Sequence, residues 1–175
     1  MELRIAGIVK ESVVDGPGLR FVIFTQGCYH HCRGCHNVDT HDPAGGRVIH
    51  TDEIMAMVNS AKLIRGVTFS GGEPFLQAEA LAYLADKIKA KGLNIVTYSG
   101  HVFEQLLTMA VGRPAVKELL HKTDILVDGP FQLEKRDLRL AFRGSTNQRL
   151  IYVPDSLKCG HIVLWDEITS FCSNA

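Results

Sequence analysis

Three cysteines stand close together in the segment G-C-Y-H-H-C-R-G-C-H-N, where Cys28, Cys32 and Cys35 have the spacing C-x₃-C-x₂-C. Thiolates so near one another in sequence can reach one metal centre. Closed zinc and iron–sulfur sites normally take four protein ligands, so three cysteines leave such a site one ligand short. A four-iron cluster held by three cysteines keeps one iron without a protein ligand, and that iron can bind a small molecule.

Other residues could instead complete a closed site. A small zinc site would need His30, His31, His36 or Cys159 as its fourth ligand, but no second C-x₂₋₄-C pair is visible. A plain electron-carrying cluster would need a fourth cysteine, which only Cys159 or Cys172 could supply. We expect both of these cysteines to be inert residues of a poorly ordered tail. His30 and His31 are expected to lie in a solvated loop.

The composition limits the class of protein. Lysine plus arginine and aspartate plus glutamate number 19 each, so no global field favours nucleic acid or an anionic membrane as a partner. No apolar run reaches the length of a membrane span, and the start MELRIAGIVKE lacks the pattern of a signal peptide. Five cysteines, three of them clustered, indicate metal-bound thiolates in a reducing compartment rather than disulfides. We therefore expect a cytoplasmic protein.

Strand-like and helix-like patterns alternate along the chain. Apolar and β-branched runs predict strands at 20–25, 66–70, 94–98, 125–128 and 150–153. Helical spacing predicts helices at 51–61, capped by Thr51, at 77–91, ended by Gly92, and at 102–111 and 114–121. This alternation implies an α/β fold with a mostly parallel sheet. Because a closed barrel needs about 250 residues, we predict an open partial (β/α) barrel of about five or six units.

The domain organisation follows from the length. A chain of 175 residues is expected to form a single domain, residues 1–175. Its core is expected over about 12–153, and the sequence leaves open how the tail, 154–175, folds.

Four polar segments each directly follow an expected strand. They are the cysteine loop, S-G-G-E-P at 70–74, Y-S-G-H at 98–101 and D-G-P-F at 128–131. The carboxyl ends of parallel strands share one edge of a sheet, so we expect these segments to meet there. Gly71 and Gly72 would let backbone approach a ligand closely. Glu73 could accept from a bound ammonium group, or be an ordinary exposed turn carboxylate.

The cysteine spacing followed by G-G-E-P resembles the radical S-adenosylmethionine family. That resemblance implies a [4Fe–4S] cluster held by Cys28, Cys32 and Cys35, whose open iron is chelated by the methionyl group of S-adenosylmethionine. It also implies one-electron cleavage of this cosubstrate to methionine and a 5′-deoxyadenosyl radical. No acid–base residue is required, because homolysis and hydrogen transfer need none. The cofactor supplies the difficult chemistry, and the protein positions it.

Further segments narrow the family. D-G-P-G-L-R at 15–20 and C-H-N at 35–37 resemble glycyl-radical-activating enzymes. The segments V-D-G-P-F at 127–131 and R-G-S-T-N-Q at 143–148 resemble the activators of anaerobic ribonucleoside-triphosphate reductase. This resemblance implies that the radical abstracts hydrogen from a backbone glycine of that reductase, with electrons from a donor such as flavodoxin. Alternatives are activation of a pyruvate formate-lyase type enzyme, or a small-molecule reaction such as deazapurine synthesis.

The resemblance also implies which residues bind the cosubstrate. Gly34, Cys35 and His36 would line its site through backbone contacts, and Gly72 would meet the methionyl end. Asp128 would reach the ribose or the cosubstrate's polar end. Most of the family places an aromatic residue, which packs on the adenine, just before the last cysteine, where this chain has Gly34. The polar residues of 143–149, namely Arg143, Asn147, Gln148 and Arg149, would either pin the partner protein or order the last strand.

Overall fold

The computed structural model describes residues 1–165, which contain one seven-stranded sheet in the order β3-β1-β2-β4-β5-β6-β7. The strands are β1 (Glu2–Ser12), β2 (Arg20–Thr25), β3 (Arg47–His50), β4 (Gly66–Gly71), β5 (Asn94–Tyr98), β6 (Ile125–Asp128) and β7 (Arg149–Tyr152). The helices are α1 (Thr51–Ser60), α2 (Ala78–Lys89), α3 (Phe103–Gly112), α4 (Pro114–Lys122) and α5 (Val153–Cys159). Short 3-10 turns lie at η1 (Val38–Thr40), η2 (Pro74–Gln77) and η3 (Leu133–Lys135).

The sheet is open, because β3 and β7 form its two edges and do not pair with each other. Strands β2, β4, β5 and β6 are parallel neighbours, while β1, β3 and β7 are antiparallel to the strands beside them. The predicted α/β class and open sheet are thus confirmed, with the parallel part made of these four strands. Strand β7 runs antiparallel to β6 because the segment 129–148 connects the end of β6 to the start of β7 at the same edge of the sheet, without a crossover helix.

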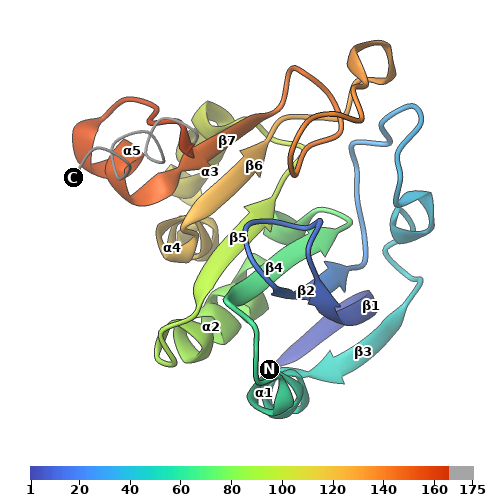
Figure 1. Ribbon diagram of the computed structural model, residues 1–175, viewed down its shortest axis with the longest axis vertical. Helices are drawn as coiled ribbons and strands as arrows, with labels where there is room; N and C mark the ends of the chain where they lie inside the picture. Colours follow the sequence, from blue (N-terminus) through green and yellow to red (C-terminus); the bar gives the residue numbers. More distant parts are fainter. Residues whose placement is uncertain (166–175) are drawn as a thin grey trace.

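The two faces of the sheet are covered differently. Phe21 and Ile23 of β2 face the helices, and with Phe69 of β4 and Ile95 of β5 they form the main core. The opposite face carries a smaller apolar cluster that includes Val96. In Figure 1, helices α2, α3 and α4 lie behind the sheet, and the loop between β1 and β2 crosses in front of it. The front face is therefore left to loops, which makes room for a site.

The loop between β1 and β2 is fastened to this front face by Arg20. The guanidinium is fully buried and donates to Thr68 Oγ1, to the Pro17 carbonyl and to Asn94 Oδ1. Thr68 in turn donates to the Asp15 carbonyl. Burial lowers the pKa of Arg20 to about 10. The arginine of D-G-P-G-L-R thus holds its own loop against the starts of β4 and β5.

Several details differ from the sequence-based expectations. Strands β1 and β3 were not expected, and His50, whose Nδ1 accepts from the Asp52 N–H, caps α1 in place of Thr51. Gly92 follows α2 with φ +74°, as expected for a stop. Cys159 is not in a disordered tail but ends α5, where it is exposed, and Cys172 lies outside the described residues.

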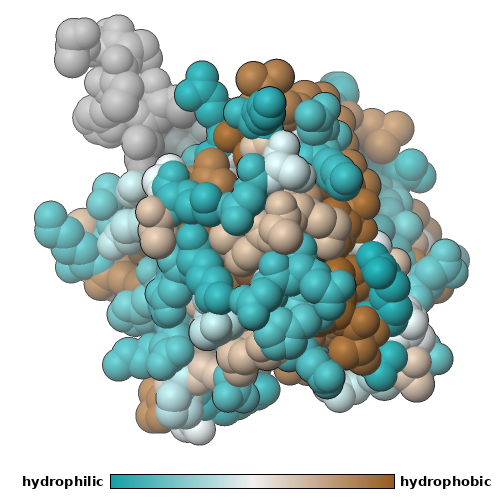
Figure 2. Space-filling model, turned by 90° about the horizontal axis from the view of Figure 1, so that it is seen from below, coloured by the Kyte–Doolittle hydropathy of each residue, from teal (hydrophilic) through white to brown (hydrophobic). Residues whose placement is uncertain are grey.

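Most of the face shown in Figure 2 is hydrophilic, with hydrophobic residues gathered in a band to the right of its centre. None of the helices within residues 1–165 has the length and apolar character needed to cross a membrane.

Candidate metal centre

The four polar segments do meet at one edge of the sheet. Thr25 pairs with Gly71, Phe69 with Thr97, and Tyr98 with Val127, so the carboxyl ends of the parallel strands are level. The three cysteines line one cavity of about 120 Å³ at this edge, together with residues of all three other segments. Its lining is Cys28, His30, Cys32, Cys35, Asn37, Ser70, Gly71, Gly72, Tyr98, Ser99, Gly100, Gly129, Phe131 and Gln148. The predicted convergence of these segments is confirmed.

Backbone hydrogen bonds shape the cysteine loop. The Cys28 N–H donates to the His41 carbonyl at 3.1 Å, and the Cys35 N–H donates to the Cys32 carbonyl at 3.1 Å. The Asn37 N–H points at Cys35 Sγ, 3.4 Å away. Hydrogen bonds to cluster sulfurs are one of the means by which proteins set the reduction potential of iron–sulfur centres. These hydrogen bonds therefore fix the backbone of the loop whose three cysteines line the cavity.

The donor set fits an iron–sulfur cluster with one open iron. All three thiols are free and partly exposed, and thiolates are the ligands that such clusters prefer. Burial raises the pKa of Cys28 and of Cys32, so these thiols resist ionisation until a bound metal ion displaces their protons. Within residues 1–165, no fourth cysteine lines this cavity.

Gly72 joins the G-G-E-P segment to the cysteine loop. Its N–H donates to the Thr25 carbonyl, and the next N–H, that of Glu73, donates to the Gly27 carbonyl, both at 2.8 Å. A Cβ atom on Gly72 would lie 2.2 Å from the Gly27 carbonyl oxygen, which no real structure tolerates. The glycine therefore allows two strand ends to touch, besides lining the cavity.

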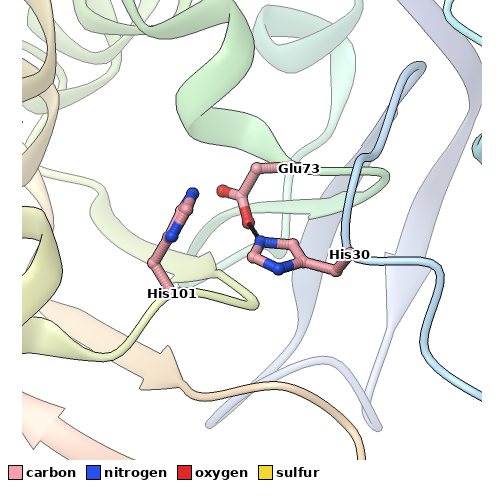
Figure 3. Close-up of side chains that lie close together, drawn as sticks. All are labelled: His30, Glu73 and His101. Atoms are coloured by element: carbon pink, nitrogen blue, oxygen red, sulfur yellow. Dashed lines mark hydrogen bonds and ion pairs between the residues drawn. The ribbon is translucent and has the colours of Figure 1, made fainter.

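Glu73 is the centre of a buried hydrogen-bond network. Its side chain accepts from Ser99 Oγ and the Gly100 N–H after β5, and from the Phe75 N–H at the start of η2. His30 Nε2 of the cysteine loop lies 3.0 Å from its Oε2 (Figure 3). Glu73 is 1% exposed, so it is not the exposed turn carboxylate considered from the sequence. Both of its oxygens already have protein donors.

His30 was expected in a solvated loop, and this expectation is wrong. Its ring packs edge-on against His101, with the centroids 4.5 Å apart. A Cβ on Gly100 would lie 2.4 Å from His30 Cδ2, so glycine leaves the space that the ring fills. Burial lowers the pKa of His101. Sequence reasoning missed the grouping of His30, Glu73 and His101, because these residues lie on three separate segments.

A larger cavity of about 470 Å³ adjoins the first one on the front face. Cys35, Asn37, Ser70, Tyr98, Phe131 and Gln148 line both cavities, and His36 lines only the larger one. Val14 and Leu138 on its rim are 72% and 79% exposed, so this cavity opens widely to solvent. Its volume lies in the range of about 300–1,000 Å³ typical of small-molecule sites.

Asp128 is fully buried and bonded within the chain. It accepts from Arg149 Nε at 3.0 Å and from the Phe103 N–H at 2.7 Å, so it anchors the start of α3. Arg149 also makes a bidentate contact with Glu104. The hydrogen bonds to both carboxylates raise the pKa of Arg149. Contact of Asp128 with a ribose stays a prediction.

The R-G-S-T-N-Q segment clamps the D-G-P-F segment. Gln148 Nε2 donates to the Gly129 carbonyl at 3.0 Å, while its Oε1 accepts from the Gly144 N–H at 2.8 Å. Asn147 Nδ2 donates to the Pro130 carbonyl at 2.8 Å. Asn147 and Gln148 thus order the loop before β7, and contact of this segment with the partner protein stays a prediction.

Comparison with known proteins agrees with this geometry. The family of 4Fe-4S single cluster domains matches residues 14–151. An anaerobic ribonucleoside-triphosphate reductase-activating protein of Enterobacteria phage T4 is 31% identical over 143 residues, 78% of this chain and 86% of the relative. Its counterpart in Vibrio cholerae is 33% identical over 145 residues, 78% of this chain and 90% of the relative.

A third relative has a different target in its name. The pyruvate formate-lyase-activating enzyme of Clostridium pasteurianum is 35% identical over 134 residues, 71% of this chain but 50% of the relative. The class is thus that of single-cluster 4Fe-4S proteins. Within it, the chain belongs to the radical S-adenosylmethionine family of activating enzymes, alongside the anaerobic reductase activators.

Proposed function

We propose that this protein generates a glycyl radical on an anaerobic ribonucleoside-triphosphate reductase. The observation that carries the proposal is the convergence of Cys28, Cys32 and Cys35 on one cavity beside Gly72. When bound there, a reduced [4Fe–4S] cluster would supply one electron to S-adenosylmethionine, giving methionine and a 5′-deoxyadenosyl radical that takes a hydrogen atom from a glycine. The reductase is the named target of two relatives that match most of this chain.

The remaining residues of the site would bind and position the cosubstrate. Gly34, Cys35 and His36 would contact it through their backbone, and Gly72 would meet its methionyl end. Asp128 would act at its ribose or polar end by anchoring the start of α3. No side chain has to move a proton, so the task of the chain is to hold the cluster and cosubstrate together and to limit the access of water.

The wide mouth of the larger cavity supports a protein as the substrate. Val14 and Leu138 leave its rim open, and a loop of a large partner can enter such a mouth. A small-molecule reaction, such as one in deazapurine synthesis, would instead favour an enclosed pocket. The second candidate target is a pyruvate formate-lyase type enzyme, which the Clostridium relative favours.

The remaining parts of the proposal concern the cellular context. We infer an electron donor such as flavodoxin, a cytoplasmic location, and no nucleic acid or membrane partner. The balance of 19 acidic and 19 basic residues supports the last point. Residues 1–175 would form a single domain. Its core extends beyond the expected bounds of 12–153, because Leu3 and Ile5 belong to it and Leu157 and Leu164 pack against it.

Metal and product analysis tests the chemistry. Anaerobically purified protein should contain about four iron and four sulfide per chain, and with a reductant it should convert S-adenosylmethionine to 5′-deoxyadenosine. Cys32→Ala should abolish both, whereas Cys159→Ala should change neither, because Cys159 is exposed on α5. About one zinc per chain without sulfide, or loss of the cluster in Cys159→Ala, would overturn the proposal.

A further inference from the structure

Phe131 lies between the two cavities and lines both of them. It follows β6 in the D-G-P-F segment and is only partly buried. In the part of the chain that the structure describes, only Tyr98 and Phe131 are aromatic residues that line both. The Tyr98 hydroxyl is bound to the Phe142 carbonyl at 2.8 Å, which ties that ring to the loop before β7. Phe131 adjoins the cysteine loop at Gly34 and His36.

Two glycines make the space in which this ring lies. A Cβ on Gly144 would lie 3.0 Å from Phe131 Cδ2 and 3.2 Å from Cε2, tighter than ordinary contact. A Cβ on Gly34 would lie 3.5 Å from Phe131 Cε1 and 3.0 Å from Leu133 Cδ1. Gly34 also has φ +76°, a conformation that side chains rarely adopt. Gly34, which precedes the last cysteine, has no aromatic side chain, and the ring of Phe131 lies beside this glycine.

The backbone on both sides of Phe131 is fixed within the chain. Asn147 holds the Pro130 carbonyl, and the Gln132 N–H donates to Ser145 Oγ at 3.2 Å. The ring itself approaches His36, with the centroids 5.2 Å apart and the planes tilted by 43°. The orientation of the ring is therefore set before any ligand arrives, so little entropy is lost when a planar group packs on it.

We propose that Phe131 is the aromatic surface on which the adenine of S-adenosylmethionine packs; this inference rests on the function proposed above. A cosubstrate held at the cysteines by its methionyl end must extend its nucleoside into the adjoining cavity. Phe131 stands at the border of the two cavities, where the nucleobase would pass. Adenine has a flat π-face, and stacking on an aromatic side chain suits any such base. The R-G-S-T-N-Q segment then serves cosubstrate binding by holding this ring.

Equilibrium dialysis on the cluster-loaded protein tests the proposal. Without reductant no cleavage occurs, so the dissociation constants of S-adenosylmethionine and of S-methylmethionine can be measured per cluster. S-methylmethionine has the same amino, carboxylate and sulfonium groups but no nucleoside. Phe131→Leu should weaken S-adenosylmethionine binding about tenfold, leave S-methylmethionine within about twofold, and retain the iron content. Phe131→Tyr, which keeps the ring, should stay within about twofold of the wild type for both ligands.

Phe131→Met is a second ringless variant in case the leucine packs badly, and it should give the same selective loss. Unchanged S-adenosylmethionine binding in Phe131→Leu and Phe131→Met would overturn the proposal. An equal loss for both ligands would also overturn it, because Phe131 would then only support the cluster site. Failure of the wild-type protein to bind S-adenosylmethionine would instead contradict the proposed function.

Discussion

His30 Nε2 lies 3.0 Å from Glu73 Oε2, and this contact joins the cysteine loop to the end of β4 across 43 positions of the chain. Glu73 is buried at 1% exposure and also binds Ser99 and Gly100 after β5. One carboxylate therefore holds three segments at the edge where the cysteines converge. A carboxylate with all its acceptor positions filled acts as a fixed centre rather than a ligand for solvent or metal.

Replacing Glu73 should loosen the cysteine loop. In Glu73→Gln an amide N–H₂ group replaces one carboxylate oxygen that accepted hydrogen bonds. The buried groups that donated to that oxygen lose their acceptor, at a cost of about 1–3 kcal/mol in unfolding free energy. We expect reduced iron per chain after cluster reconstitution, measured by iron and sulfide assay. His30→Ala should lower iron in the same direction. The exposed His31, which contacts His41, provides the control, and His31→Ala should retain wild-type iron. Equal iron in all three variants would contradict this role.

A methyl group at position 72 should be harmful. In Gly72→Ala the Cβ would lie 2.2 Å from the Gly27 carbonyl oxygen, so backbone must shift at the point where the loop begins. We expect a loss of about 1–3 kcal/mol or more in unfolding free energy, measured by denaturant titration. Gly112→Ala is the matched control, since nothing lies within 4 Å of a Cβ there. At the end of α3, that change should be neutral or stabilise by up to about 1 kcal/mol. Similar losses in both variants would refute the steric argument.

Replacing Arg149 should lower the unfolding free energy, because the buried carboxylate of Asp128 would lose its ion-pair partner. Asp128 is fully buried, and Arg149→Met would leave it with the Phe103 N–H as its remaining partner of those seen. We expect a loss of about 3 kcal/mol in unfolding free energy, at the low end of the range for broken buried pairs, because Arg149 is 32% exposed. The double variant Asp128→Asn with Arg149→Met should recover part of that loss. No recovery would mean that Arg149 stabilises β7 by packing alone.

The ion pair of Glu104 with Arg149 predicts a pH dependence. Hydrogen bonding to Arg149 lowers the pKa of Glu104 from its ordinary value of 4.5. The contribution of this carboxylate to stability is therefore present above that value and is lost as the pH falls through the lower, folded-state pKa. Glu104 is largely exposed, so Glu104→Gln should cost only about 0.5 kcal/mol at pH 7. The difference in unfolding free energy from the wild type should vanish at low pH; a difference independent of pH would count against the ion pair. Glu118→Gln, on the exposed side of α4, is the charge-matched control.

The sequence was sufficient for the parallel strands and for the edge where chemistry gathers. Buried parallel strands are apolar throughout, which made 20–25 and 125–128 easy to identify. Strands β1 and β3 were missed because they lie at one side of the sheet, where exposed polar residues interrupt the pattern. The hydrogen bond between His30 and Glu73 depends on tertiary placement, which no local spacing encodes. Likewise, only the structure shows that Phe131 comes to lie beside Gly34.

The most direct test of the central claim is electron paramagnetic resonance of the partner's glycyl radical. The reduced, cluster-loaded protein would be mixed anaerobically with S-adenosylmethionine and either the reductase or a pyruvate formate-lyase type enzyme. We predict a doublet signal on the reductase, which should collapse toward a single line when that protein contains glycine deuterated at Cα. Cys32→Ala should give no signal. A doublet that forms only on the lyase, or on neither protein, would contradict the account.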